Sequence, residues 1–285
     1  MQQRRLGDLS VSAIGRGAMP MSTDPYPPRE RALRTLHAAL DAGVTLVDTA
    51  DAYCSGPDDV GHNERLVAEG LATWGGDRDA VLVATKGGHV RTPDGGWALD
   101  GRPEHLRRAC EASLQALGVE AVGLYQFHRP DPQVPWAESV GAVEELRQEG
   151  KVRLVGVSNA DPDQIREAAA LTQLASVQNE LSPRFRSSEP EVELCEQLGV
   201  AFLPWSPLGG MGSAADLGSA HAAFGEVARE HGVSPQQVCL AWLLAKSPVV
   251  VPIPGASRPE SVLDSVAAVR LVLSDDERAR LDASG

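Results

Sequence analysis

Eight short apolar runs alternate with amphipathic helical segments along almost the whole of this 285-residue chain. Such alternation is typical of successive βα units that build a parallel sheet. The runs are rich in Val and Leu, as strands covered on both faces should be. They occupy residues 13–17, 44–48, 81–86, 122–127, 152–158, 175–178, 200–204 and 249–253. Eight units in about 250 residues predict a (β/α)₈ TIM barrel of the α/β class.

The two ends of the chain add to this barrel. Gly7-Asp8 is a turn signal between the short segments 4–6 and 9–11, which predicts a β-hairpin outside the barrel. Ser274 and Glu277 have the spacing of a capping box, which predicts a C-terminal helical extension. No segment has the composition of a linker, so we expect a single domain over residues 1–285.

An open, doubly wound sheet is the alternative architecture. Such a sheet normally carries a G-x-G-x-x-G dinucleotide motif between its first strand and first helix. Residues 15–20, Gly-Arg-Gly-Ala-Met-Pro, lack the third glycine and lead into no helical pattern. The sequence therefore favours the barrel.

Charge and composition exclude several classes of partner. The formal net charge is −13, which disfavours nucleic acids and anionic membranes as partners. The longest apolar run, residues 238–245, is far shorter than the roughly 20 residues of a membrane span. No apolar leader follows Met1, so a cytoplasmic location is expected. The four cysteines lie far apart without a C-x-x-C pair, which predicts neither a metal site nor a disulfide framework.

Polar residues stand where the apolar runs end, and in a barrel these strand ends meet at one mouth that carries the active site. Lys86 is the most informative of them, because it ends an apolar strand and is one of only three lysines in the chain. A buried ammonium needs an anionic partner. Asp48, at the end of the neighbouring strand, can supply one.

Two further side chains complete a candidate catalytic set. Tyr53 follows Asp48 closely enough for its hydroxyl to fold over the mouth, where an adjacent ammonium would lower the phenol pKa and make it a usable acid. His128 follows the fourth strand and could orient a substrate oxygen. Singly, Asp48 also fits a helix cap and His128 a structural histidine. Together, the four suit protonation of a carbonyl oxygen while hydride reaches its carbon.

Several short motifs occur in order along the chain. They are Val-Asp-Thr-Ala-Asp-Ala-Tyr at 47–53, Asn-Glu at 63–64, Ala-Thr-Lys-Gly at 84–87, the histidine at 128, Gly-Val-Ser-Asn at 156–159, Gln-Asn-Glu at 178–180, Trp-Ser-Pro-Leu-Gly at 205–209 and Ile-Pro-Gly-Ala at 253–256. With these motifs, almost the entire chain resembles the aldo-keto reductase family. The resemblance implies NAD(P)H-dependent reduction of an aldehyde or ketone to the alcohol. It makes Asp48, Tyr53, Lys86 and His128 the catalytic tetrad, with Tyr53 as the general acid.

The resemblance also implies NADPH, bound extended across the barrel mouth without a dinucleotide-binding fold. From the nicotinamide to the adenosine end, it assigns to the cofactor Ala18, Met19, Asp48, Ser158, Asn159, Gln178, Trp205, Ser206, Leu208, Gly210, Gly255, Ser257, Arg258, Ser261, Asp264 and Ser265. At the adenosine end the chain departs from the family pattern, which often has a Glu-Asn pair at the adenine and several cations at the 2′-phosphate.

Arg258 is the only obvious cation in that last segment. A planar guanidinium suits a phosphate, so NADPH is expected over NADH. The alternative is that Arg258 is a solvated residue in the first turn of a helix.

Substrate selection is expected from the loops after the strands. Trp97, in the Gly-rich segment 92–102, and Arg129, directly after His128, are the candidates that would join Tyr53 and His128 around a small carbonyl compound. The alternatives are a surface tryptophan and a solvated arginine. The sequence identifies neither the physiological substrate nor the oligomeric state.

Two rival functions remain open on the sequence. Lys86 could serve as a Schiff-base nucleophile, although a nearby Asp48 favours the charged lysine that such chemistry must avoid. The chain could also be a subunit that senses a bound nicotinamide cofactor with little turnover, as some relatives of the family do.

Overall fold

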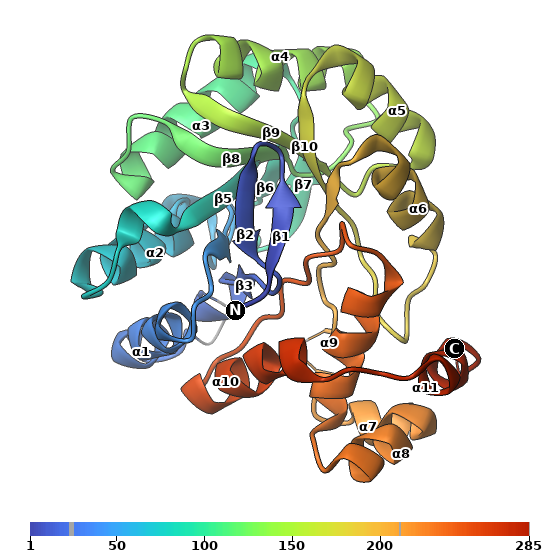
Figure 1. Cartoon of the computed structure of the whole chain (residues 1–285). Coiled ribbons are helices and arrows are strands. Elements are labelled where there is room, and N and C mark those ends of the chain that lie inside the picture. The colour runs from blue at the N-terminus through green and yellow to red at the C-terminus, as the bar shows by residue number, and fades with distance from the viewer. Residues whose placement is uncertain (23–25, 211, 285) are drawn as a thin grey trace.

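A parallel sheet curls into a barrel in the computed structural model, which describes residues 1–22, 26–210 and 212–284 (Figure 1). Its seven strands lie side by side in chain order. They are β3 (Arg16–Gly17), β4 (Leu46–Asp48), β5 (Leu82–Gly87), β8 (Val122–Phe127), β9 (Val152–Ser158), β10 (Leu174–Gln178) and β11 (Ala201–Phe202). Each lies within or next to one of the predicted apolar runs, and the α/β class is confirmed.

The eighth predicted run, residues 249–253, closes the ring without forming a regular strand. On one side, Phe202 of β11 exchanges backbone hydrogen bonds of 2.9 and 2.8 Å with residues 249 and 251. On the other, residues 15 and 17 donate to the carbonyls of Pro252 and Pro254 at 2.9 and 3.1 Å. The two prolines have no N–H to return. The prediction of a regular eighth strand is therefore wrong, because on the side of residues 15–17 the hydrogen bonds run in one direction only.

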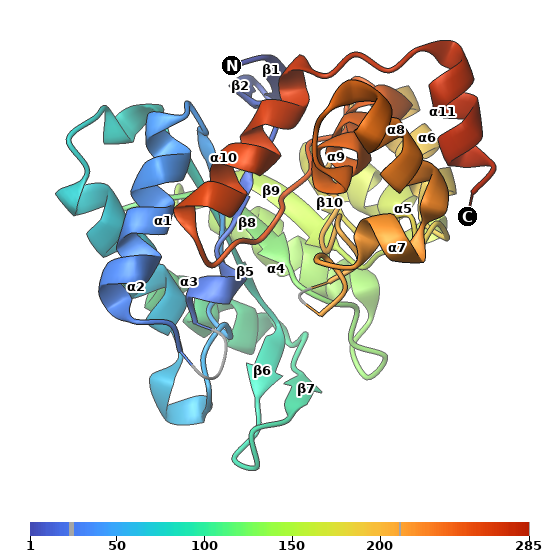
Figure 2. The ribbon, with the colours of Figure 1, turned by 90° about the horizontal axis from the view of Figure 1, so that it is seen from below.

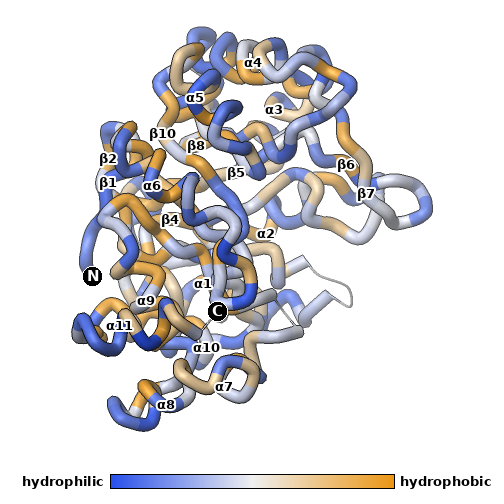
Figure 3. Tube along the Cα trace, turned by 90° about the vertical axis from the view of Figure 1, so that its right-hand side faces the viewer, coloured by the Kyte–Doolittle hydropathy of each residue, from blue (hydrophilic) through white to orange (hydrophobic). Residues whose placement is uncertain are grey.

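Helices cover the outside of the barrel (Figures 1 and 2). They are α1 (Arg29–Asp41), α2 (His62–Thr73), α3 (Pro103–Leu117), α4 (Trp136–Gln148), α5 (Pro162–Leu171), α6 (Glu189–Leu198), α7 (Leu217–Ala220), α8 (Ala222–His231), α9 (Pro235–Lys246), α10 (Pro259–Ala267) and α11 (Asp275–Asp282). In Figure 3 they alternate between hydrophilic and hydrophobic residues, as expected where one face lies on a core. The capping box of Ser274 and Glu277 begins α11, so the predicted C-terminal helical extension is confirmed.

The predicted N-terminal hairpin is present and fills one end of the barrel. Strands β1 (Gln3–Leu6) and β2 (Leu9–Ser12) pair antiparallel around Gly7, whose φ of +60° is a conformation that glycine adopts without strain. Leu6 and Val11 are buried among leucines from the starts of the barrel strands. The hairpin thus closes the end opposite the carboxyl ends of the strands.

A second hairpin departs from the sequence prediction. Within the segment expected to be a loop, β7 (Trp97–Leu99) pairs antiparallel with β6 (His89–Arg91). Figure 2 shows the two hairpins at opposite ends of the barrel. The β6–β7 hairpin therefore stands beside the mouth that the strand ends form. Every helix among the described residues falls short of the length and apolar character that a membrane span requires.

Candidate active site

Lys86 of β5 is at the centre of a buried polar cluster at this mouth. Its side chain is fully enclosed, and its Nζ donates to Asp48 Oδ2 at 2.7 Å, to the Thr49 carbonyl at 2.8 Å and to the Tyr53 hydroxyl at 3.2 Å. Each ammonium hydrogen thus has an acceptor. The anionic partner that the sequence predicted for this lysine is in place.

The partners of Lys86 also determine its charge. Burial by itself would lower the Lys86 pKa, but the Asp48 carboxylate and the Tyr53 hydroxyl together outweigh that effect and raise the pKa above its usual value. Lys86 is therefore an ammonium at neutral pH. A Schiff-base nucleophile must be a neutral amine, so the arrangement opposes that rival function.

Asp48 is held at both of its carboxylate oxygens. While Oδ2 accepts from Lys86, Oδ1 accepts from the side-chain amides of Gln178 at 2.8 Å and Gln126 at 3.3 Å. Gln126 was not identified by sequence reasoning, although it stands two residues before His128 on the same strand. With all of these contacts buried, the carboxylate has a single orientation toward the lysine.

Tyr53 shows the reverse of the expected electrostatic effect. Burial raises the pKa of its phenol, and the Lys86 ammonium opposes this only in part. The predicted lowering is wrong, because sequence reasoning took account of the neighbouring charge but not of the desolvation. The phenol is accordingly protonated at neutral pH. Since Lys86 donates to its oxygen, the phenol hydrogen is free to donate elsewhere.

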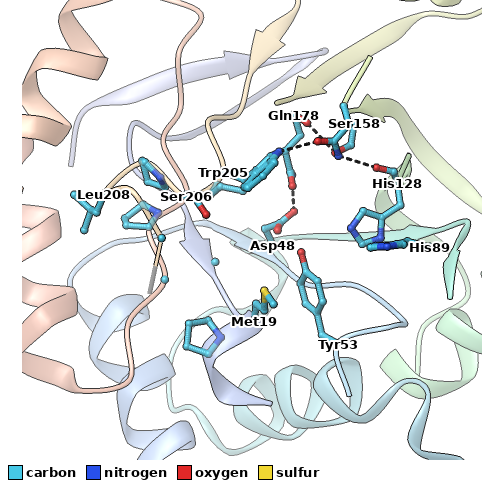
Figure 4. Close-up of a pocket in the computed structure, with 18 of the residues that line it drawn as sticks. Met19, Asp48, Tyr53, His89, His128, Ser158, Gln178, Trp205, Ser206 and Leu208 are labelled. Carbon is cyan, nitrogen blue, oxygen red and sulfur yellow. Dashed lines mark hydrogen bonds between the residues drawn. The ribbon is translucent and has the colours of Figure 1, made fainter. Parts of the chain in front are cut away.

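His128 carries a buried ring nitrogen, Nδ1, with no hydrogen-bond partner among the described residues. Its pKa lies well below the usual value because of burial and, secondarily, the nearby charges of Lys86 and Arg129. The imidazole is therefore neutral. Its ring lies edge-on to Tyr53 with 5.9 Å between the centroids, so both polar side chains meet at one place (Figure 4).

The β6–β7 hairpin adds an aromatic wall to this place. His89 stacks on Trp97 with ring centroids 4.3 Å apart, and it also lies edge-on to His128 with 5.0 Å between the centroids. Trp97 is 42% exposed and, like Arg129, lines the cavity above Tyr53. His89 was missed by sequence reasoning. Its position just after the glycines that end β5 was the available signal.

A hydrogen-bonded chain joins the ends of β9 and β10 to the next turn. Asn159 donates to the Ser158 hydroxyl at 2.9 Å, Ser158 donates to the Gln178 carbonyl at 2.8 Å, and Trp205 Nε1 donates to Asn159 Oδ1 at 3.2 Å (Figure 4). Among the described non-glycine residues, only Asn159 and Ser206 have positive φ, at 57° and 47°. Such strained backbone clusters at functional sites.

Comparisons with known proteins agree with this geometry. The sequence model of the Aldo/keto reductase family matches residues 13–285. The chain belongs to this family. An uncharacterized oxidoreductase of Schizosaccharomyces pombe is 35% identical over 285 residues, covering 99% of this chain and 89% of the relative.

Solved structures match this aldo/keto reductase family member along its length. A Klebsiella pneumoniae aldo/keto reductase in complex with NADP and acetate has a TM-score of 0.81 at 29% identity, covering 99% of this chain and 94% of that one. The Gluconobacter oxydans glycerol dehydrogenase has a TM-score of 0.86 at 27% identity, with the same shares covered. The family supports oxidoreductase activity.

Two adjoining cavities, each of about 610 Å³, form a groove across the mouth of this family member. The first contains the tetrad surface and the second lies toward α10. Most residues expected to bind the cofactor line one or both: Met19, Asp48, Ser158, Asn159, Gln178, Trp205, Ser206, Leu208, Gly210, Gly255, Ser257, Arg258, Ser261, Asp264 and Ser265. Residues that line both, such as Leu208 and Gly255, make the groove continuous.

Three positions differ from the expectation. Ala18 is completely buried and lines neither cavity, because its backbone packs against the end of β4. Asp264 lines the second cavity, but its carboxylate already accepts from Ser234 at 2.7 Å and Gln237 at 2.6 Å. Arg31 of α1 lines the same cavity and was missed, since no local signal links a residue so early in the chain to α10.

Proposed function

We propose that this chain reduces an aldehyde or ketone to the alcohol, with NADPH as the hydride donor and Tyr53 as the proton donor. One observation carries the proposal: Lys86, fully buried and held by Asp48, donates to the Tyr53 hydroxyl at 3.2 Å beside an unpartnered nitrogen of a neutral His128. No group of three or more His, Cys, Asp or Glu side chains that could hold a metal ion occurs among the described residues.

The groove supports a nicotinamide dinucleotide as the cofactor. It is continuous from the tetrad to Arg258, and its inner end presents the polar groups of Ser158, Asn159 and Gln178 that a carboxamide needs. The indole of Trp205, fixed through Asn159, offers a face on which the nicotinamide ring would stack. Bound there, the cofactor supplies the hydride.

The protein's own residues would control the proton. Tyr53 keeps its hydrogen at neutral pH and can donate it to the substrate oxygen as that oxygen gains negative charge. Lys86 would stabilise the phenolate left behind, while Asp48 keeps the lysine charged and in place. The neutral imidazole of His128 can donate a second hydrogen bond to the same oxygen, which orients the carbonyl.

Two arginines support NADPH over NADH. Arg258, before α10, and Arg31 of α1 line one cavity from different elements, and neither guanidinium has a hydrogen-bond or ion-pair partner among the described side chains. Glu260 adds a negative charge, but the Asp264 carboxylate is occupied by Ser234 and Gln237. A phosphate between two free guanidiniums is the ligand that such a site favours.

The direct test is a fluorescence titration of the purified protein with NADPH and NADH, followed in the same cuvette by aromatic and aliphatic aldehydes. Tight NADPH binding with oxidation on aldehyde addition is the expected result. Binding without turnover across the panel, also when the protein concentration is raised, would indicate a cofactor-sensing protein instead. No binding of either cofactor would overturn the proposal.

A further inference from the structure

Arg129 brings an unbalanced positive charge into the active-site cavity. It follows β8 directly after His128, is half-buried and lines the cavity above the tetrad. Within the described part of the chain its guanidinium has neither a hydrogen bond nor an ion pair, and its contact is with the ring of Trp205, 5.9 Å away. In a chain of net charge −13, a cation left without an acid partner in a cavity requires an explanation.

The acids near Arg129 do not neutralise it. Asp48 shares the cavity, but its carboxylate is bonded to Lys86 and two glutamine amides. Glu180 is close enough for Arg129 to lower its pKa, although burial raises that pKa overall. The two make no ion pair within 4.0 Å. Arg129 is thus a half-buried cation without an ion pair among the described residues, and a ligand could neutralise it.

The other basic groups of the cavity carry no charge at neutral pH. Burial, with Arg129 and Arg91 nearby, lowers the pKa of His89 to about 4. The His128 pKa is also well below its usual value, chiefly through burial. Among the described residues that line this cavity, only Asp48 and Arg129 are therefore charged, and only Arg129 is unpaired.

We propose that the carbonyl substrate of this chain carries an anionic group, a carboxylate or a phosphate, which Arg129 binds while Tyr53 and His128 hold the carbonyl oxygen. This inference rests on the proposed function. A guanidinium binds either anion through paired N–H donors. The stacked rings of His89 and Trp97 form a flat apolar wall beside these groups, which suits an aromatic body between carbonyl and anion.

The test compares matched aldehydes of similar shape. The carboxylate arm pairs 4-carboxybenzaldehyde with its neutral methyl ester, and the phosphate arm pairs 4-formylphenyl phosphate with 4-methoxybenzaldehyde. For at least one arm, kcat/KM of the wild type should favour the anion by about tenfold or more, and the larger ratio identifies the anion. Salt should reduce that ratio by screening the charge.

The variants locate the effect at Arg129. Arg129→Gln should reduce the anion-to-neutral ratio by about tenfold, mainly through KM, and Arg129→Lys should restore part of it. The ratio compares two substrates on one protein, so it is insensitive to a general loss of folded protein. As a matched control, Arg166→Gln removes a surface arginine of α5 that pairs with Asp163, and it should change neither ratio nor turnover.

Three outcomes would contradict the inference. If the wild type reduces the acid and its ester equally well, and likewise both members of the phosphate pair, Arg129 does not select anions although the proposed function stands. If Arg129→Gln lowers activity on both members of a pair by the same factor, the arginine has a structural role only. If none of the four aldehydes is reduced with NADPH or NADH, the proposed function is overturned together with this inference.

Discussion

The two ends of the groove differ in whether their charged side chains have partners within the protein. At the tetrad, Lys86 and Asp48 are buried and satisfy their hydrogen bonds within the protein. At the other end, Arg31 and Arg258 are exposed and without side-chain partners among the described residues. The comparison shows that the reacting end is organised before any ligand arrives, as electrostatic stabilisation of a transition state requires. At the binding end, where Arg31 and Arg258 lie, the opposite charge would come from the ligand.

This difference predicts where substitutions affect turnover and where they affect cofactor affinity. Tyr53→Phe should have the largest effect on the reaction, a decrease in kcat of about 10²- to 10⁴-fold, because it removes the proton donor together with the hydroxyl to which Lys86 donates. NADPH affinity should be unchanged, and fluorescence titration with steady-state kinetics measures both. Tyr26→Phe, which removes a hydroxyl bonded to Ser55 and Asp59 outside the site, is the control. A Tyr53→Phe protein with wild-type kcat would remove the phenol from the mechanism.

Asp48→Ala should lower the free energy of unfolding of the protein. It leaves the Lys86 ammonium buried without its carboxylate, which typically destabilises a protein by about 3–5 kcal/mol. Urea unfolding followed by circular dichroism measures the free energy of unfolding. Asp163→Ala breaks an exposed ion pair with Arg166 and should cost less than about 1 kcal/mol. An equal loss of unfolding free energy in the two variants would show that breaking the buried Lys86–Asp48 pair costs no more than breaking an exposed ion pair.

Arg258→Ala should act on the binding end alone. Loss of a charged hydrogen-bond donor to the 2′-phosphate should raise the NADPH dissociation constant by about 10- to 100-fold. The NADH dissociation constant should change little, because NADH has no phosphate at that position. Arg31→Ala should shift NADPH binding in the same direction by a smaller factor. Equal weakening of both cofactors by Arg258→Ala would contradict the assignment of a phosphate site.

The pH profile of reduction should show the smallest change. Tyr53, with a raised pKa, stays protonated, and His128 and His89, with lowered pKa values, stay neutral between pH 6 and 8. The kcat/KM for a neutral aldehyde should therefore vary by less than about twofold in this range. A steep change centred near pH 6.5 would mean that one of the histidines titrates normally.

Stability should follow the same lowered pKa values. The unfolded histidines bind protons below about pH 6.5, whereas the folded His89 binds one only near pH 4, so the folded state loses stability as the pH falls through this interval. Urea unfolding at pH 7 and pH 5 should show a smaller loss for His89→Asn than for the wild type. An equal loss in both proteins would contradict the lowered pKa of His89.

Local patterns account for most of what the sequence predicted. Seven parallel strands, both predicted extensions and the meeting of Asp48, Tyr53, Lys86 and His128 follow from apolar runs and the residues that end them. The eighth strand was wrongly predicted to be regular, because an apolar composition does not show that Pro252 and Pro254 lack the N–H groups a regular strand needs. The β6–β7 hairpin was missed because its short pairing lies in a Gly-rich segment without clear alternation.

The sequence by itself thus determined the order of the βα units and the chemistry at their ends, because strand period, helix caps and residue type are properties of neighbours along the chain. Only the tertiary structure decided the sign of the Tyr53 pKa shift, the contact of His89 with His128 and the joint position of Arg31 and Arg258. Each of these depends on burial or on residues distant in the chain. Desolvation and long-range contact arise only when the barrel is closed.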